Sequence, residues 1–180
     1  MTGNFQSSAN QGQVYESFNM AELWKLPVVY VIENNRYAMG TSINRSSATV
    51  NLSQRGVSFN IEGEQVDGMD IRAVKAAGEK AVKWCREGEG PYILEMLTYR
   101  YRGHSMSDPA KYRTREEVEK VRTEHDPIEQ VRQRLIEKGL SEDALKKIDT
   151  EVRAKVNEAA EFATNDPEPD PSELYTDVLR

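Results

Sequence analysis

Two short segments of the chain gather side chains that can bind ions or move protons. The first, Glu33–Tyr37, contains two adjacent asparagines, and the second, Thr98–Asp108, carries His104 and Ser105 among basic residues. Amide and carbonyl oxygens are ligands for hard cations such as Mg²⁺. Imidazole titrates near neutral pH and can therefore donate or accept a proton. These residue types allow a cation site at the first segment and an acid–base or phosphate-binding site at the second.

Each segment also has a purely structural interpretation. The Asn34-Asn35 pair suits the polar end of a strand, because asparagine favours turns. His104 taken alone would be a solvated residue in a basic surface turn, since an isolated histidine more often has no functional role. The second histidine, His125, precedes a helix start in a highly charged region, and we assign it no role. The choice depends on the elements that position the two segments.

The residues around these segments predict alternating helices and strands. Apolar residues fall at helical spacing over Gln13–Leu26, Pro27 ends that helix, and Val28–Ile32 is a β-branched run without polar alternation. Such a run is typical of a strand buried on both faces of a parallel sheet. The pattern continues with a short strand over Glu64–Asp67, a helix over Ile71–Glu87 with Asp70 as its N-cap, and a second strand over Pro91–Tyr99.

This order predicts an α/β fold that is part of a doubly wound, mostly parallel sheet with a C-terminal helical extension. Ligand sites in such sheets lie beyond the carboxyl ends of the strands, and both segments follow strands. The polar stretch Asn34–Asn60 has no periodicity, and we interpret it as an irregular loop, either flexible or functional. The charged C-terminal region predicts three helices, and the longest begins at Ser141 with an apolar stripe up to Phe162.

Composition excludes several classes of function. A net charge of -6 argues against nucleic acid as a partner, because phosphate binding needs a basic patch. No apolar run is long enough to cross a membrane. Cys85 is the single cysteine and falls on the apolar face of a helix, so it is interpreted as a small hydrophobic residue in a reducing compartment. We expect a cytoplasmic protein, or one of the mitochondrial matrix if a transit peptide has been removed.

The first segment, read together with Ala9–Gln13, resembles a known cofactor motif. It is similar to the thiamin-diphosphate and magnesium motif of 2-oxo acid dehydrogenase alpha subunits, which opens Gly-Asp-Gly-Ala-Ala-Asn-Gln-Gly and closes with Asn-Asn. The resemblance implies that the Asn35 side chain and the Tyr37 carbonyl bind the metal and contact the cofactor. Where the family has Gly-Asp-Gly-Ala-Ala, this chain has Phe5–Ala9. Gln6 therefore replaces the metal-binding aspartate, and Ser7 and Ser8 stand where cofactor contacts would be.

The second segment, with Tyr112-Arg113-Thr114 after it, resembles the active-site loop of the pyruvate-specific members of the same family. The resemblance implies that His104 is a catalytic residue and lies close to the cofactor diphosphate. Ser105 matches a serine whose phosphorylation switches off mitochondrial members. A second phosphorylated position of the family corresponds to Lys111, which has no hydroxyl.

The resemblance covers essentially all of Ala9–Leu179 and implies the C-terminal half of an alpha subunit. We divide the chain into residues 1–8, a leader outside the family pattern or a cloning remnant, a truncated cofactor-binding α/β domain at 9–112, and a helical extension at 113–180. The implied partners are a beta subunit in an α2β2 heterotetramer and a lipoyl-bearing acetyltransferase. The implied cofactors are thiamin diphosphate and Mg²⁺.

The activity that the resemblance implies is oxidative decarboxylation of pyruvate with acetyl transfer to a lipoyl group. Because the opening of the cofactor motif is missing, we expect the isolated chain to be inactive. Two alternatives stay open. The chain could be a non-catalytic binding module that docks on a beta or alpha subunit through the stripe in Ser141–Ala163, or it could belong to a relative that acts on another 2-oxo acid.

Overall fold

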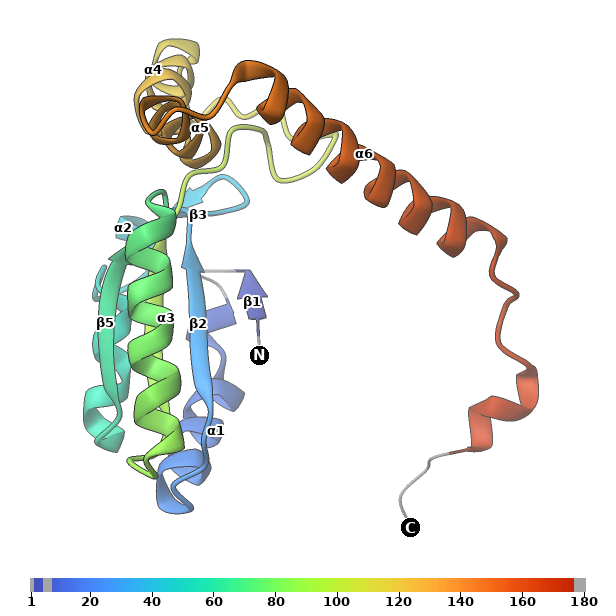
Figure 1. Ribbon diagram of the computed structural model, residues 1–180. Coiled ribbons are helices and arrows are strands. Elements are labelled where there is room, and N and C mark those ends of the chain that lie inside the picture. The colour runs from blue at the N-terminus through green and yellow to red at the C-terminus, as the bar shows by residue number, and fades with distance from the viewer. Residues whose placement is uncertain (1, 5–7, 177–180) are drawn as a thin grey trace. The chain divides into compact units, whose positions relative to one another are not determined.

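A four-stranded parallel sheet forms the centre of the computed structural model, which describes residues 2–4 and 8–176. In spatial order the strands are β1 (Thr2–Asn4), β2 (Val29–Asn34), β6 (Tyr92–Leu97) and β5 (Glu62–Asp67). Each neighbouring pair is parallel (Figure 1). The predicted α/β class with a parallel sheet is therefore confirmed. The chain divides into two units, Met1–Val131 with the sheet and Arg132–Arg180.

The carboxyl ends of three strands lie level with one another. Leu97, the last residue of β6, pairs with Asn34 at the end of β2 and with Asp67 at the end of β5. Residues that follow these strands therefore emerge at one edge of the sheet, where ligand sites of such folds are found. Both segments with candidate chemistry begin at this edge.

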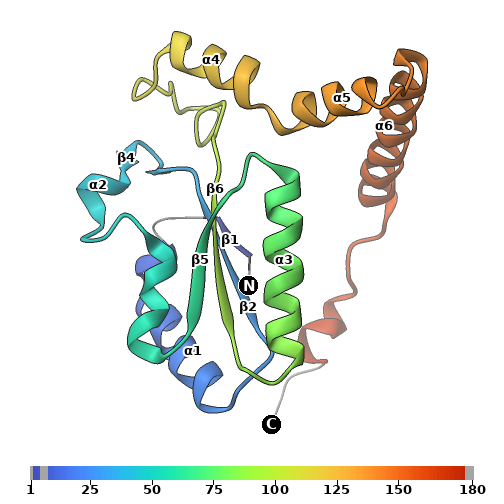
Figure 2. The ribbon, with the colours of Figure 1, turned by 60° about the vertical axis from the view of Figure 1, so that its left-hand side comes forward.

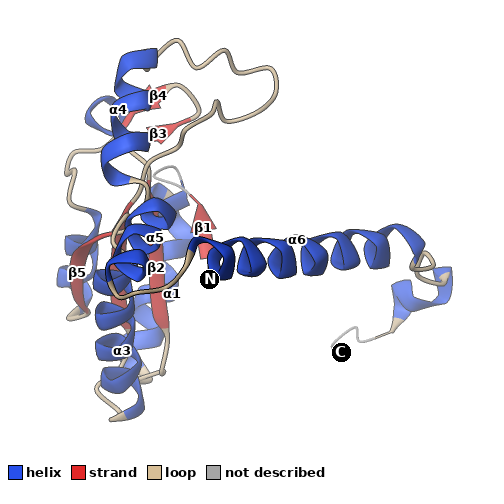
Figure 3. Ribbon diagram, turned by 45° about the horizontal axis from the view of Figure 1, so that its top comes forward, coloured by secondary structure: helices blue, strands red, loops and turns tan. Residues whose placement is uncertain are grey.

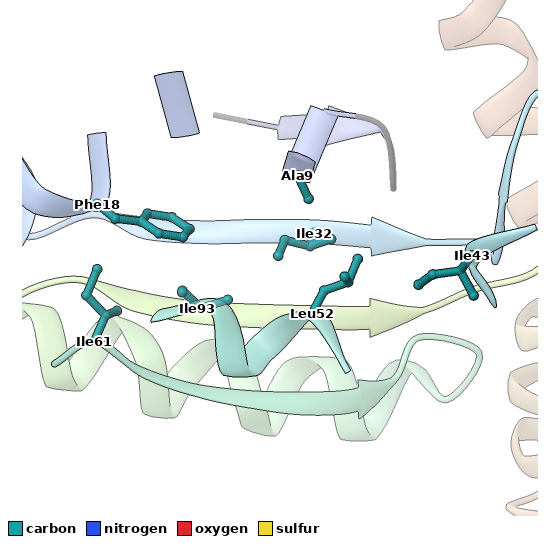
Figure 4. Close-up of a cluster of buried hydrophobic side chains, with 7 residues drawn as sticks. All are labelled: Ala9, Phe18, Ile32, Ile43, Leu52, Ile61 and Ile93. Carbon is teal, nitrogen blue, oxygen red and sulfur yellow. The ribbon is translucent and has the colours of Figure 1, made fainter. Parts of the chain in front are cut away.

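Helices cover both faces of the sheet. On one face lie α1 (Gly12–Leu23) and the 3₁₀ helix η2 (Leu52–Phe59), and on the other lies α3 (Ile71–Arg86) (Figure 2). The first face is packed around the fully buried Leu52 and Ile93, with Phe18 of α1 against β2 (Figure 4). Full burial of side chains of this size stabilises the fold by roughly 1.5–3 kcal/mol each. Because side chains alternate along a strand, β6 contributes to both cores.

The second face has the structure that the sequence predicts. Helix α3 begins after Asp70, whose side chain accepts a hydrogen bond from the N–H of Arg72 at 2.9 Å. Cys85 is buried on this helix, burial raises the pKa of its thiol, and its sulfur lies 3.6 Å from the carbonyl oxygen of Val28. A protonated, buried thiol is a poor nucleophile, which agrees with the interpretation of Cys85 as a small hydrophobic residue.

Replacing Asp70 with alanine is expected to lower the free energy of unfolding by about 1 kcal/mol, because the first turn of α3 loses a side-chain acceptor. Urea denaturation followed by circular dichroism measures this change. Glu79→Ala, an exposed change inside the same helix, is the matched control and should stay within about 0.5 kcal/mol of the unchanged chain. An equal loss in both variants would show that the cap contributes nothing specific.

The stretch Asn34–Asn60 is not the irregular loop that its polarity suggests. It forms the strands β3 (Tyr37–Ala38) and β4 (Thr41–Ser42), the short helix α2 (Ile43–Ser46) and η2, and β2 itself extends to Asn34. Isolated apolar residues, Ile43 and Leu52, hold these elements in the core. Elements this short contain too few residues to show a period, and for this reason the prediction of an irregular loop was wrong.

Two further details differ from the expectation. Helix α1 ends at Leu23, three residues before the predicted end, and Trp24, which follows it, is 58% exposed. Strand β1 arises from residues 2–4, where the polar sequence predicts no element. Trp84, by contrast, packs edge-on against Tyr92 with ring centroids 5.9 Å apart.

The C-terminal region forms the three predicted helices, and the longest begins after Ser141 as expected. They are α4 (Arg115–His125) after Thr114, α5 (Pro127–Glu137) and α6 (Glu142–Asn165) after Ser141, followed by the 3₁₀ turn η3 (Pro171–Tyr175). Helix α6 is one continuous helix (Figure 3). Leu145 is its buried residue in the described part of the chain, whereas Val156 and Phe162 are 62% and 68% exposed. Within residues 2–4 and 8–176, no helix is long and apolar enough to span a membrane.

Candidate functional site

Two consecutive asparagine turns shape the chain where β2 ends. The side-chain oxygen of Asn34 accepts a hydrogen bond from Arg36 N–H at 2.9 Å, and that of Asn35 accepts one from Tyr37 N–H at 3.1 Å. Arg36 has a φ of 69°, in the left-handed region that helps to turn the backbone sharply. These turns carry the chain from β2 into β3 and place the Asn35 side chain and the Tyr37 backbone side by side.

A fully buried carboxylate supports this turn from below. Glu95 of β6 is 0% exposed, and its Oε1 accepts a hydrogen bond from Asn34 Nδ2 at 2.6 Å. Its Oε2 accepts hydrogen bonds from the backbone N–H of Ser53 at 2.9 Å and from Gln65 Nε2 at 3.1 Å. Glu95 therefore ties β2, β5 and η2 together beneath the candidate site. Sequence reasoning missed this residue, although a glutamate inside an otherwise apolar strand already indicates a buried polar group with hydrogen-bond partners.

The two oxygens predicted to bind a metal converge on one point. Asn35 Oδ1 and the carbonyl oxygen of Tyr37 each accept a hydrogen bond from Nη2 of Arg100, and both distances are 3.1 Å. A guanidinium group thus lies against the two oxygens that the resemblance assigns to Mg²⁺. The structure therefore brings the Asn35 and Tyr37 oxygens together around the guanidinium of Arg100.

Arg113 joins the second segment to the first. Its Nη2 donates a hydrogen bond to the carbonyl oxygen of Asn35 at 2.8 Å, and its Nη1 donates one to the carbonyl oxygen of Arg100. The guanidinium lies 4.2 Å from the ring centroid of Tyr99 and 4.8 Å from that of Tyr37, distances typical of cation–π contacts. One side chain therefore holds the ends of both segments in place.

Tyr99 links Arg113 to helix α4. Its hydroxyl donates a hydrogen bond to Glu117 at 2.8 Å. Burial, together with this hydrogen bond, raises the pKa of Tyr99 to about 12. The phenol therefore stays neutral at physiological pH, and its ring contacts the guanidinium of Arg113.

Asp108 organises the loop that carries His104. Its carboxylate accepts hydrogen bonds from His104 N–H at 2.7 Å, Ala110 N–H at 2.9 Å and the Tyr112 hydroxyl at 2.8 Å. Gly103 packs against this loop so closely that an added Cβ would lie 2.3 Å from the Asp108 carbonyl oxygen. The His104 side chain itself is exposed at the surface of the loop. Asp108 therefore fixes the backbone at His104 and leaves the imidazole accessible.

Ser105 lies next to His104 in the same exposed loop. Its hydroxyl oxygen is 3.0 Å from that of Ser107, close enough for a hydrogen bond in either direction. The structure therefore places this predicted regulatory residue where a modifying enzyme could reach it.

The order of this loop is expected to depend on pH through Asp108. The N–H groups of His104 and Ala110 and the Tyr112 hydroxyl hold the pKa of the Asp108 carboxyl below its usual value of 3.8. A lowered folded-state pKa means that the carboxylate stabilises the loop above pH 3.8 and that this contribution is lost as the pH falls through the lowered value.

An NMR titration of the His104 amide should therefore show a shift with a midpoint below 3.8. Asp108→Asn is the control and should lack this transition. A midpoint at or above 3.8 in the unchanged chain would contradict the role of Asp108.

The remaining predicted contacts fall elsewhere or outside the described residues. Gln6 and Ser7 lie outside the described residues. Ser8 begins the 3₁₀ turn η1 (Ser8–Asn10), and in the described part of the chain no hydrogen bond joins it to Asn35 or Tyr37. This turn is held by Arg55, which donates to the carbonyl oxygen of Ala9. A contact between Ser8 and the cofactor therefore stays a prediction.

The donors and charges of the site fit a metal bound to an anionic cofactor. The candidate ligands, Asn35 Oδ1 and the Tyr37 carbonyl, are amide and carbonyl oxygens, which are ligand types that Mg²⁺ accepts. Arg100 Nη1 and Arg113 Nε are buried and have no hydrogen-bond partner among the described residues. These donors suit an anion such as a diphosphate.

A cavity of about 700 Å³ opens beside this arrangement. Its walls include residues that follow all three level strands, among them Tyr37, Met69 and Thr98, together with Arg113 and His125. Sequence analysis assigns His125 no role, because the charged residues around it do not indicate that it lies in this wall. The space lies at the strand ends where the fold predicts a ligand.

Residues 5–172 match the family described as "Dehydrogenase E1 component". The match covers most of the chain, and the chain therefore belongs to this family of enzymes.

Individual relatives have one description in common, pyruvate dehydrogenase E1 component subunit alpha. The protein of that name from Rhizobium meliloti (strain 1021) is 70% identical over 173 residues, which are 96% of this chain and 50% of the relative. The one from Zymomonas mobilis is 56% identical over 96% of this chain and 49% of its own length. The somatic mitochondrial form from Sus scrofa is 53% identical over 93% of this chain and 43% of its own length. The chain spans about half the length of the curated relatives it matches.

Proposed function

We propose that this chain is part of an alpha subunit of a thiamin-diphosphate-dependent pyruvate dehydrogenase. The observation that carries the proposal is the joining of the two segments: Arg100 of the second segment and Arg113, which follows that segment, both donate hydrogen bonds to Asn35 of the first. Residues far apart in the sequence thus meet at the carboxyl edge of the sheet, where the fold expects a ligand. The names of the relatives support pyruvate as the substrate.

The roles of the residues follow from their chemistry. Asn35 Oδ1 and the Tyr37 carbonyl would hold Mg²⁺, and the unpaired Nε of Arg113 would face anionic oxygens. Thiamin diphosphate, when bound, supplies the carbanion chemistry for decarboxylation. His104 would donate a hydrogen bond to the diphosphate or move a proton during acetyl transfer to a lipoyl group.

The proposed partners are a beta subunit in an α2β2 heterotetramer and a lipoyl-bearing acetyltransferase. The proposed location is the cytoplasm, since several of the matched relatives are bacterial. Phosphorylation of Ser105 would add negative charge to a loop held by short hydrogen bonds. Such a charge would interfere with an anionic cofactor nearby.

Co-expression with a beta subunit tests the proposal. We expect the isolated chain to show no pyruvate decarboxylation and the co-expressed complex to show it. Within an active complex, His104→Ala should lower kcat by about 10²–10⁴-fold, the range typical of a lost acid–base group. Met106→Ala, a fully exposed change in the same loop, should leave kcat unchanged.

A stable complex without decarboxylation would contradict the enzymatic proposal. Calorimetry with thiamin diphosphate and Mg²⁺ checks separately whether the isolated chain binds the cofactor. Binding by the isolated chain would contradict the expectation that the chain is inactive because its cofactor site is incomplete.

A second candidate function is that of a binding module, favoured by one observation on α6. Its apolar residues Ile148, Val152, Val156 and Phe162 are 48–68% exposed and recur at spacings that place them near one face. Such a face suits docking on another subunit. A stable but inactive complex with the beta subunit, lost on Val152→Asp, would favour this function over the enzymatic one.

A further inference from the structure

The guanidinium of Arg100 donates hydrogen bonds to the same two oxygens that are proposed to bind the metal. We propose that Arg100 is an internal cation that holds Asn35 Oδ1 and the Tyr37 carbonyl in their ligand arrangement and has to withdraw before a divalent cation binds. The supporting geometry is the pair of 3.1 Å distances from Arg100 Nη2 to these oxygens. This inference rests on the proposed function, in which both oxygens are metal ligands.

The lone pairs of Asn35 show why the two cations exclude each other. An amide oxygen has two lone pairs. One of those on Asn35 Oδ1 accepts Tyr37 N–H, and the other accepts Arg100 Nη2. Mg²⁺ needs its oxygen ligands at about 2.0–2.1 Å and therefore needs a lone pair that is already used. Because Tyr37 N–H belongs to the turn that shapes the site, the guanidinium is the donor that leaves.

Charge leads to the same result. The guanidinium group of an arginine carries a positive charge. A divalent ion on the same two oxygens would lie close to that positive charge in a half-buried site, where water screens the repulsion only in part. Binding of the ion and withdrawal of the side chain are therefore coupled.

The surroundings of Arg100 allow its side chain to move while its backbone stays in place. The Arg100 carbonyl accepts a hydrogen bond from Arg113, which is itself packed on Tyr99 and Tyr37. The other terminal nitrogen, Nη1, is buried without a hydrogen-bond partner in the described part of the chain. The guanidinium also interacts with the Tyr112 hydroxyl and the Asp108 carboxylate of the adjacent loop, so these groups stay near it when it leaves the two oxygens. Metal affinity is then set in part by the strength of this internal competitor.

Mn²⁺ titrations followed by electron paramagnetic resonance test the competition without cofactor or activity. We expect Arg100→Met to bind Mn²⁺ about tenfold more tightly than the unchanged chain, the change in affinity that corresponds to one charge-assisted hydrogen bond. The matched control is Arg102→Met, which removes the same charge from an exposed position in the same segment. This control should bind Mn²⁺ as the unchanged chain does.

Equal Mn²⁺ affinity in all three chains, including binding too weak to detect in any of them, would overturn the inference. If circular dichroism shows that Arg100→Met does not fold, Arg100→Gln is compared in the same way, since it also removes the charge. The result is independent of catalysis. An inactive complex with the beta subunit would count against the proposed function, whereas the Mn²⁺ comparison reports on Arg100 alone.

Discussion

Glu95→Gln is expected to lower the free energy of unfolding by about 2–3 kcal/mol, although the change conserves the size of the side chain. The carboxylate accepts three hydrogen bonds, from Asn34, Ser53 and Gln65. An amide has one oxygen and one NH₂ group, so at least one of these buried donors would face another donor. A buried donor without an acceptor has lost its water and gained no partner.

Urea denaturation followed by circular dichroism measures the loss. The control is Glu62→Gln at the start of β5, where the side chain is exposed, and there the change should stay within about 0.5 kcal/mol. We also expect the Glu95 variant to disturb the turn at Asn34, visible as a shift of the Asn35 and Tyr37 amide resonances. A variant as stable as the unchanged chain would show that Glu95 does not support the site.

Arg113→Met is expected to open the loop between β6 and α4. The change keeps an apolar side chain against Tyr99 but removes the hydrogen bonds to the carbonyl oxygens of Asn35 and Arg100. A loss of about 2 kcal/mol in local stability raises the population of the open loop about 30-fold. Trypsin cleavage after Arg102 and Lys111, two exposed positions of the loop, should become faster in proportion.

Mass spectrometry of the early fragments measures these cleavage rates under native conditions. Arg115→Met, an exposed change at the start of α4, is the control and should leave the rates unchanged. Arg113→Lys should behave nearly like Arg113→Met, since an ammonium group cannot reach both carbonyls and stack as a planar guanidinium does. If the Arg113→Lys variant were cleaved as slowly as the unchanged chain, the positive charge alone would be enough to hold the loop.

Much of the fold follows from local sequence patterns. The β-branched run that becomes β2, the amphipathic stretch of α3 and the apolar run of β6 are long enough to show their period, and they were predicted within a few residues of their observed ends. Helix α1 also follows the pattern, although it ends earlier. What failed was the stretch after β2, where short elements depend on single buried residues such as Ile43 and Leu52.

The candidate site was predicted in its residue types and not in its connections. Asn35, Tyr37 and the loop of His104 do lie at one edge of the sheet, because level parallel strands bring their carboxyl ends together. The links themselves, from Arg100 and Arg113 to Asn35, join residues 65 and 78 positions apart. No local pattern encodes such pairs, since they form only when β2 and β6 are already paired in register.

The buried hydrogen bond between Glu95 and Asn34 spans 61 positions and has a consequence for how the chain folds. If β6 paired with β2 one residue out of register, Glu95 would turn to the opposite face of the sheet and meet the apolar core under α3. A carboxylate there would have no donors, so that misaligned pairing would be short-lived. Glu95→Leu removes this penalty, and its refolding should show added slow phases as misaligned chains persist. Glu95 therefore also favours the correct register between β2 and β6 while the sheet forms.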